Sequence, residues 1–174
     1  MDLTIQPRRL SGVVEAIPSK SQAHRLLICA AFSDRPTELI CPSTNQDIEA
    51  TAACLCSLGA KITRTNNGYH VIPATQIPKT AVLNCNESGS TLRFMLPIAG
   101  ALGVDTVFEL AGRLPYRPLS PLWEELERMG CCLSRPTENT IHLQGRLQPG
   151  KYTIDGSVSS QFITGLLYAT ALMK

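Results

Sequence analysis

The chain has 174 residues, of which 44% are hydrophobic and 17% are charged, and its formal net charge is +2. This composition is ordinary for a globular protein, and the length allows one sizeable domain or two small ones. The sequence has no basic run that would mark nucleic-acid binding, no signal-peptide pattern at its start and no apolar stretch long enough for a membrane span. We expect a cytoplasmic protein whose partners are neither nucleic acids nor membranes.

The cysteines and histidines do not follow a metal-binding pattern. The seven cysteines include no Cys-x-x-Cys pair, and most have apolar neighbours, as in the stretch LLICAAF. Such cysteines are typical packing residues of a reducing compartment. His24, His70 and His142 stand far apart in the sequence, whereas a metal site needs clustered ligands. We therefore expect neither a metal nor a cofactor.

The hydrophobic pattern predicts a repeated unit of order βαβαββ. In the first unit the turn residues Asp34-Arg35-Pro36 end a helix, and Asn66-Asn67-Gly68 predicts a hairpin turn. The elements predicted for this unit are strand 10–16, helix 21–32, strand 37–40, helix 45–58, and strands 61–65 and 69–72.

The same pattern recurs along the chain with a period of about 70 residues. The second unit has predicted strands at 81–84, 106–111, 132–134 and 140–143, with helices at 90–101 and 119–129. The third unit has only a strand at 152–154 and a helix at 160–173. The units span 10–74, 80–145 and a truncated 150–174, so we expect the chain to be a piece of a longer protein.

The first helix of each unit begins with a pair of serines. The pairs are Ser19 and Ser21, Ser88 and Ser90, and Ser159 and Ser160. One serine is enough to cap a helix, and such a cap is worth about 1 kcal/mol. The free N–H groups and partial positive charge of a helix N-terminus also bind anions. Two interpretations stand: the serines only cap helices, or the three N-termini converge on an anionic ligand.

Basic residues accompany these serines. Lys20 lies within the first pair, Arg25 follows one turn later, and Arg117 lies in the proline-rich loop GRLPYRPLSPL. A guanidinium can hold a carboxylate or phosphate through two hydrogen bonds, whereas the lysine ammonium is a point charge. We expect Lys20, Arg25 and Arg117 to bind anions, and the alternative for Arg117 is a solvated loop cation.

The second serine pair surrounds a glycine and is followed by an arginine. Gly89 suits a position where the backbone must approach a ligand closely. For Arg93 two interpretations stand. Its guanidinium faces the anion site, or it pairs with Glu87 or with an acidic residue of another unit.

Four motifs of the chain resemble, in order and spacing, a known family of enolpyruvyl transferases. They are PSKSQAHRLLICAA, NESGSTLRFMLPIAG, GRLPYRPLSPLWEELERMGC and DGSVSSQFITGLLYA. The family is 5-enolpyruvylshikimate-3-phosphate (EPSP) synthase, or 3-phosphoshikimate 1-carboxyvinyltransferase. The resemblance implies an α/β (α+β) fold of six βαβαββ units that form an inside-out α/β barrel of two domains. It also implies that 1–9 is a strand of the other domain, that 10–174 is a substrate-binding domain and that the complete protein is a monomer.

The resemblance further implies an activity and its ligands. The family transfers the enolpyruvyl group of phosphoenolpyruvate to the 5-hydroxyl of shikimate 3-phosphate, in the shikimate pathway towards aromatic amino acids. The residues that match the phosphoenolpyruvate ligands are Lys20, Gly89, Arg117 and Gln161. Those that match the shikimate 3-phosphate ligands are Lys20, Ser21, Arg25, Ser159, Ser160 and Gln161. The catalytic acid and base belong to the other domain, so we expect no turnover by this chain alone.

The chain departs from the family pattern at two positions beside Gly89, which also lies in the glyphosate-binding region. Glu87 stands where the family often has asparagine, and Phe94 replaces a proline that often follows the arginine. The sister enzyme UDP-N-acetylglucosamine enolpyruvyl transferase is one alternative, but its Gly-Ala-Lys-Asn-Ala start differs from Pro18-Ser19-Lys20-Ser21. A non-catalytic, anion-binding half-domain is the other alternative.

Overall fold

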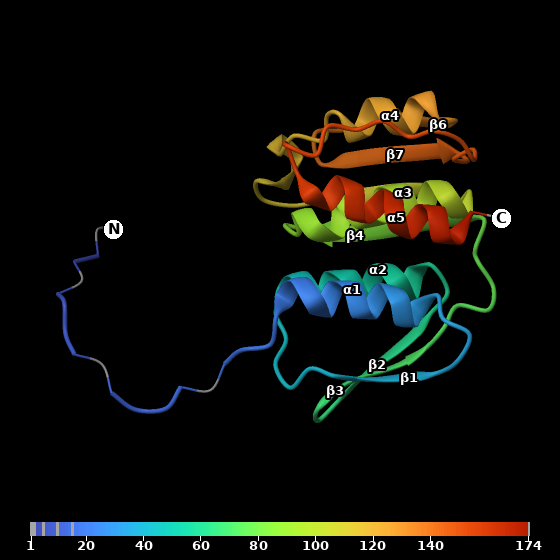
Figure 1. The fold of residues 1–174 in the computed structure, drawn as a ribbon. Coiled ribbons are helices and arrows are strands. Elements are labelled where there is room, and N and C mark those ends of the chain that lie inside the picture. Colours follow the sequence, from blue (N-terminus) through green and yellow to red (C-terminus); the bar gives the residue numbers. More distant parts are fainter. Residues whose placement is uncertain (1–2, 5, 10, 15, 174) are drawn as a thin grey trace.

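The computed structural model describes residues 3–4, 6–9, 11–14 and 16–173. Two α/β repeats lie one above the other, with helices α1, α2, α3 and α5 in the middle of the molecule (Figure 1). The sheet of the first repeat covers one side of this helical layer, and strands β6 and β7 with helix α4 lie on the opposite side. None of the helices within the described residues is long and apolar enough to cross a membrane.

The first repeat follows the predicted order from its first helix onward. It contains α1 (Lys20–Ala31), β1 (Thr37–Ile40), α2 (Gln46–Ser57), β2 (Lys61–Thr65) and β3 (Gly68–Ile72). The three strands form an antiparallel sheet of order β1-β3-β2, in which Leu39 pairs with Tyr69. Both of these side chains are buried under α1 and α2, so the sheet and the helices share one apolar layer.

The strand predicted at 10–16 is wrong. Residues 11–14 and 16 form no strand, while residues 10 and 15 lie outside the described residues. This segment runs away from the body of the protein (Figure 1), and the side chains of Val13 and Val14 are 101% and 92% exposed. A strand needs a neighbouring strand for its N–H and C=O groups, and the described residues 11–14 and 16 are paired with no strand. Residues 3–4 and 6–9 of the strand predicted at 1–9 are likewise not in a strand.

The second repeat has the complete βαβαββ order that the sequence predicts. Its elements are β4 (Thr80–Asn86), α3 (Gly89–Leu102), β5 (Asp105–Leu110), the 3-10 turn η1 (Leu114–Tyr116), α4 (Leu122–Arg128), β6 (Cys131–Ser134) and β7 (Thr140–Gly145). The sheet has the order β4-β5-β7-β6, with β4 and β5 parallel and the other pairs antiparallel. Helix α4 begins later than predicted, because a residue that precedes a proline, here Ser120 before the N-cap Pro121, is disfavoured in the α conformation.

In the third unit, only the predicted helix is present, as α5 (Ser160–Leu172). Residues 152–154, predicted as a strand, are not in one. Side chains of α4 take up the backbone hydrogen bonds of this segment instead. The N–H of Thr153 donates to Glu125 Oε1 over 2.5 Å, and Arg128 Nη2 donates to the carbonyl of Lys151 over 2.7 Å. The segment is therefore fixed to a helix rather than to a sheet edge.

Helices α3 and α5 pack closely against each other, which sets the position of the α5 N-terminus. A Cβ atom at Gly165 would lie 2.5 Å from the carbonyl oxygen of Arg93 and 2.8 Å from Cγ of Pro97. Only glycine allows this approach, since real Cβ atoms do not come so near to backbone oxygen. The contact holds the first turns of α3 and α5 side by side.

All seven cysteines are free, and the expectation that they pack in the interior is only partly met. Cys41, Cys54, Cys85 and Cys131 are buried. The other three, Cys29 in α1, Cys56 in α2 and Cys132 in β6, are exposed.

Candidate functional site

Helices α1, α3 and α5 begin at the same end of the molecule, on the left in Figure 1. In each helix the first serine of the pair is the N-cap. The side-chain oxygens of Ser19, Ser88 and Ser159 accept hydrogen bonds from the backbone N–H groups of Gln22, Thr91 and Gln161 over 3.2–3.3 Å. The capping interpretation therefore holds for one serine of each pair. The second serine of each pair lies within the first turn, where its hydroxyl serves no cap.

Ser21 and Arg25 lie together in α1, as the sequence predicts. Arg25 Nη1 donates to Ser21 Oγ over 2.5 Å and to the Ser21 carbonyl over 2.7 Å. Its Nη2 reaches Thr164 Oγ1 of α5 over 3.4 Å, and its guanidinium lies 5.3 Å from the ring centre of Phe94 in α3. Arg25 thus brings the N-terminal parts of three helices to one place.

Lys20, in contrast, faces an acidic side chain. Its Nζ lies 2.7 Å from Oδ2 of Asp47, and about half of the lysine side chain is exposed. Asp47 lies in the first turn of α2. An anion at Lys20 must therefore share the ammonium group with the carboxylate of Asp47.

Gly89 and Arg117, which the resemblance assigns to the same ligand, lie close together, although Arg117 comes from the loop after η1. A Cβ atom at Gly89 would lie 3.0 Å from Arg117 Nη1, so the missing side chain makes room for the guanidinium. Arg117 is exposed and follows η1 directly, and its backbone N–H donates to the Leu114 carbonyl over 3.1 Å. A guanidinium beside free helix N–H groups makes a suitable place for a carboxylate or phosphate.

Gln161 connects the N-termini of α3 and α5. Its Oε1 accepts a hydrogen bond from Arg93 Nη1 over 2.9 Å, and its Nε2 donates to Ser90 Oγ over 2.7 Å. Ser159 is half-buried, and Ser160 is exposed at the same helix start. The structure therefore brings Gly89, Arg117 and Gln161 into one region through Arg93 and Ser90, neither of which is among the residues that match the family's ligands.

The pairing of Arg93 with Glu87, one of the two interpretations of this arginine, is wrong. Glu87 Oε1 instead accepts from the backbone N–H of Arg113 over 3.1 Å. Arg93 donates to neutral oxygens, those of Gln161 and of the Pro118 carbonyl. Burial and the neighbouring positive charge of Arg117 lower the pKa of Arg93. In the sequence, the contact of Arg93 with this region is indicated only by its position one turn after Ser90, on the same face of the helix.

Behind the helix N-termini lies a buried chain of side-chain hydrogen bonds. His24 Nδ1 lies 2.7 Å from Thr51 Oγ1, which lies 2.7 Å from Thr91 Oγ1, and Thr91 donates to Ser88 Oγ over 2.7 Å. These residues link α1, α2 and α3. Burial lowers the pKa of His24 to about 4, so the imidazole is neutral at pH 7. Among the described residues, no partner reaches its Nε2 atom.

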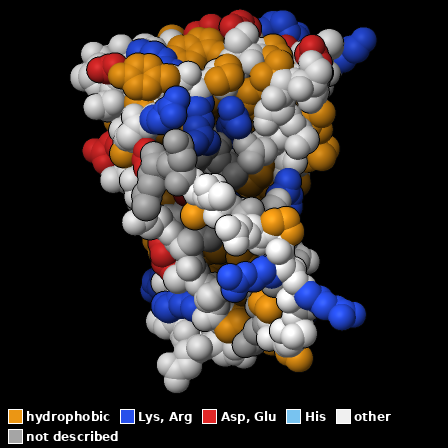
Figure 2. Space-filling model, turned by 90° about the vertical axis from the view of Figure 1, so that its left-hand side faces the viewer, with side chains coloured by type: hydrophobic (Ala, Val, Ile, Leu, Met, Phe, Trp, Pro, Cys, Tyr) orange, Lys and Arg blue, Asp and Glu red, His pale blue; other side chains and the backbone are white. Residues whose placement is uncertain are grey.

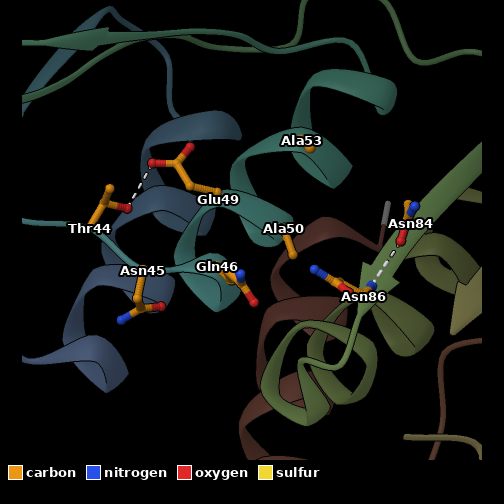
Figure 3. Close-up of a pocket in the computed structure, with 8 residues that line it drawn as sticks. All are labelled: Thr44, Asn45, Gln46, Glu49, Ala50, Ala53, Asn84 and Asn86. Carbon is orange, nitrogen blue, oxygen red and sulfur yellow. Dashed lines mark hydrogen bonds between the residues drawn. The ribbon is translucent and has the colours of Figure 1, made fainter. Parts of the chain in front are cut away.

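An open cleft of about 630 Å³ separates the two repeats at this end (Figure 3). Its walls come from the start of α2 and the end of β4, and are formed by Thr44, Asn45, Gln46, Glu49, Ala50, Ala53, Asn84 and Asn86. Lys20 lines an adjoining cleft of about 410 Å³ with Asn45, Gln46 and Asp47. The larger cleft is lined by amides and one carboxylate rather than cations, so it is less suited to an anion than the region around Arg25 and Arg117.

Figure 2 shows the same end of the molecule, where Lys and Arg side chains gather in the upper half. The described residues contain no group of three or more His, Cys, Asp or Glu side chains arranged for a metal ion. The donors at the three helix N-termini are hydroxyls, amides and cations, which suit an anionic organic ligand better than a metal.

A sequence comparison agrees with the motifs. The family model described as EPSP synthase (3-phosphoshikimate 1-carboxyvinyltransferase) matches residues 5–174. The chain belongs to the EPSP synthase family. The 3-phosphoshikimate 1-carboxyvinyltransferase of Clostridium beijerinckii is 38% identical, with 99% of this chain and 42% of the relative covered. The 3-phosphoshikimate 1-carboxyvinyltransferase of Clostridium kluyveri is 36% identical, with 99% of this chain and 41% of the relative covered.

Solved structures show the same fold. EPSP synthase from Acinetobacter baumannii has a TM-score of 0.78 at 21% identity, over 94% of this chain and 38% of that one. The enolpyruvyl transferase NikO from Streptomyces tendae has a TM-score of 0.58 at 16% identity, over 92% and 38%. The predicted family and α/β fold class are therefore confirmed. The chain spans 41–42% of the length of these curated relatives, about one domain of the fold.

Proposed function

We propose that this chain binds shikimate 3-phosphate and phosphoenolpyruvate as part of an EPSP synthase. The complete reaction moves the enolpyruvyl group to the 5-hydroxyl and yields 5-enolpyruvylshikimate 3-phosphate and phosphate. One observation carries the proposal: Gly89, Arg117 and Gln161, predicted ligands from three separate segments, lie in one region connected by Arg93 and Ser90. Both substrates are anions, which the positive helix N-termini and the arginines favour.

Each side chain has a role that follows from its place. Arg117, beside the α3 N-terminus, holds the phosphoenolpyruvate, and the absent side chain of Gly89 lets the ligand approach the backbone. The Ser21–Arg25 pair and the start of α5, with Ser159 and Ser160, hold shikimate 3-phosphate. In this assignment Gln161 lies between the two ligands.

The reaction is an addition followed by an elimination. In the addition, the 5-hydroxyl oxygen loses its proton and bonds to C2 of phosphoenolpyruvate, while C3 takes up a proton. In the elimination, C3 gives up a proton, the bond from C2 to the phosphate oxygen breaks, and C2 and C3 regain their double bond as phosphate leaves. Lys20 and Arg117 stabilise charge that develops on the phosphate and carboxylate. The proton transfers need a general acid and base, which we assign to family residues outside this chain. We therefore propose that this chain has no turnover alone.

Further assignments rest on the same family membership. We assign residues 10–174 to one substrate-binding domain and residues 1–9 to the other domain. We also propose a cytoplasmic location and a monomeric complete protein. The chain's partial coverage of its relatives supports a site completed by additional residues of the family fold.

A titration with shikimate 3-phosphate, followed by backbone amide NMR, tests the proposal. The expected shifts are focused on Ser21, Arg25, Ser160 and Gln161. The variant Ser160→Ala should weaken binding by about tenfold, the effect of one lost hydrogen bond to a charged ligand. Ser134→Ala is the matched control, since Ser134 is exposed on β6. Equal affinities for both variants, or no shifts at millimolar ligand, would contradict the proposal.

Measurement of turnover tests the proposal that this chain is inactive alone. The purified chain, given both substrates, should release no phosphate above background. Phosphate release together with formation of the enolpyruvyl product would show that this chain contains an acid and a base of its own.

A further inference from the structure

We propose that Arg93 is a positioning residue that holds the Gln161 amide and the Arg117 loop in one fixed arrangement, and that it does not bind the anionic ligand itself. This inference rests on the proposed function for its consequence in binding. Arg93 belongs to the second motif, but it is not among the residues that match the family's ligands.

The guanidinium of Arg93 is already occupied on three sides. Nη1 donates to Gln161 Oε1 over 2.9 Å, and Nη2 donates to the Pro118 carbonyl over 3.2 Å. The central carbon lies 5.2 Å from the ring centre of Phe162, which is fully buried. A guanidinium binds a carboxylate or phosphate best with two parallel N–H groups. Here the two terminal nitrogens point to different elements, so the group serves as a bridge.

The bridge gives the Gln161 side chain a defined direction. Arginine can only donate hydrogen bonds, so the atom that faces Arg93 must be the amide oxygen. The amide nitrogen then faces Ser90 Oγ over 2.7 Å. A free glutamine at a helix start can present either its oxygen or its nitrogen to a ligand. Arg93 removes that choice and leaves one N–H of the Nε2 group to meet an anion.

The second bond fixes the loop that carries Arg117. Pro118 follows Arg117 directly, so the bond from Arg93 Nη2 to the Pro118 carbonyl anchors the backbone beside the exposed cation. This loop places Arg117 Nη1 3.0 Å from the position of a Cβ atom at Gly89. Arg93 therefore connects the predicted phosphoenolpyruvate contact, Arg117, with Gln161, which is assigned to both ligands. Pre-organised contacts of this kind raise affinity because less ordering remains for the ligand to impose.

The variant Arg93→Lys tests the proposal, because lysine keeps the positive charge but has one nitrogen in place of the two that donate to Gln161 and Pro118. The first readout is ligand-free: the NMR signals of the Gln161 side-chain amide. In the wild type we expect two well-separated amide protons with slow solvent exchange. In Arg93→Lys we expect the chemical-shift difference between the two Gln161 amide protons to become small. Their exchange with solvent should be about tenfold faster, which corresponds to one lost hydrogen bond. Arg135→Lys is the matched control, since Arg135 is exposed and stacks on Trp123 away from the site. Unchanged Gln161 signals in Arg93→Lys would overturn the proposal.

The second readout is the affinity for phosphoenolpyruvate and for shikimate 3-phosphate in a double-mutant cycle with Ser90→Ala. If Arg93 acts through Gln161, each single variant weakens binding by about tenfold and the double variant is little worse than either. If the losses multiply, to about a hundredfold, Arg93 contacts the ligand independently and the proposal is wrong. Unfolding midpoints of all variants show whether folding is retained. If Arg93→Lys does not fold, Ser90→Ala decides: its Gln161 Nε2 signals should shift while the Arg93 side-chain signals stay, and movement of both would contradict a fixed bridge.

The two proposals fail in different ways. If the wild-type chain binds neither ligand, yet the Gln161 amide signals change in Arg93→Lys, the proposed function is wrong and the positioning role of Arg93 is supported. If the wild type binds both ligands and the Gln161 signals do not respond to Arg93→Lys, the function stands and the bridge is wrong.

Discussion

The first and second repeats share one order of elements but differ in the completeness of their sheets. The second repeat has a four-stranded sheet in which β4 pairs with β5 in parallel. In the first repeat β1 corresponds to β5, and the described residues provide no strand at the position of β4. A groove of about 460 Å³ runs between α1 and β1 at this position, lined by Leu26, Cys29, Ala30, Ser33, Thr37, Glu38, Leu39 and Ile40. The difference shows that a segment with a strand pattern forms a strand only where a neighbouring strand provides partners for its backbone hydrogen bonds.

The helix N-termini of the two repeats differ as well. By their distance from the serine pairs, His24 in α1 corresponds to Arg93 in α3. His24 is neutral and buried in a chain of hydroxyls, whereas Arg93 is charged and half-buried beside Arg117. Lys20 in the first repeat faces Asp47, whereas both hydrogen bonds of the Arg93 guanidinium go to neutral oxygens. At these positions the first repeat has an ion pair and a neutral histidine, whereas the second repeat has an arginine without an acidic partner among the described residues.

The largest expected effect comes from equivalent substitutions in the two first strands. Leu83 in β4 is fully buried, and Val13, about one period earlier, is fully exposed. Leu83→Ala should lower the free energy of unfolding by about 2–5 kcal/mol, because it leaves a cavity in the core. Val13→Ala should change it by less than about 0.5 kcal/mol. Urea unfolding monitored by circular dichroism measures both. A similar loss for both variants would show that residues 10–16 pack like β4 in solution.

The next effect concerns the dependence of stability on pH. The pKa of His24 is about 4 in the folded protein and 6.5 in the unfolded chain, so the unfolded state binds more protons between these values. Stability is therefore complete above pH 6.5 and is lost as the pH falls towards 4, by on the order of 3 kcal/mol. Unfolding measured from pH 7 to pH 4 tests this loss. His24→Gln, which cannot titrate, should be much less sensitive in this range, and an identical acid sensitivity would show that His24 is not the cause.

A smaller effect separates the two N-caps. Ser88 is buried and also accepts from the hydroxyl of Thr91, whereas Ser19 is exposed. Ser88→Ala should cost about 1–2 kcal/mol of stability, and Ser19→Ala about 0.5–1 kcal/mol. Thermal unfolding under identical conditions gives the comparison. The reverse order would mean that the buried hydroxyl chain adds nothing to the cap of α3.

The smallest effect on stability is expected at Lys20. Its partner Asp47 is partly exposed, and ion pairs of this kind are worth about 0–1 kcal/mol. Asp47→Asn should leave the unfolding midpoint nearly unchanged and should increase the affinity for inorganic phosphate, because the ammonium group no longer faces a carboxylate. Phosphate titration followed by the amide signals of Lys20 and Ser21 measures this effect. A weaker affinity in the variant would show that Asp47 helps to hold the anion.

The sequence alone predicted most helices, the hairpin strands and the family. The period of about 70 residues, the serine pairs and the glycine-containing turns are local signals, and local signals decide where a helix begins or a hairpin turns. The resemblance to the family, rather than these local signals, assigned Ser21 with Arg25 to one ligand and Gly89 with Arg117 to the other. In the structure the two residues of each pair lie close together.

Tertiary structure alone decided the rest, since it depends on neighbours that are distant in the chain. Residues 10–16 and 152–154 have strand patterns, but the described residues of the first segment form no strand, and Thr153 in the second is bound by Glu125. The bridge from Arg93 to Gln161 joins residues of two separate repeats, which no local pattern predicts. A sequence records which side chains are available, and the packing of α3 against α5 determines which of them meet.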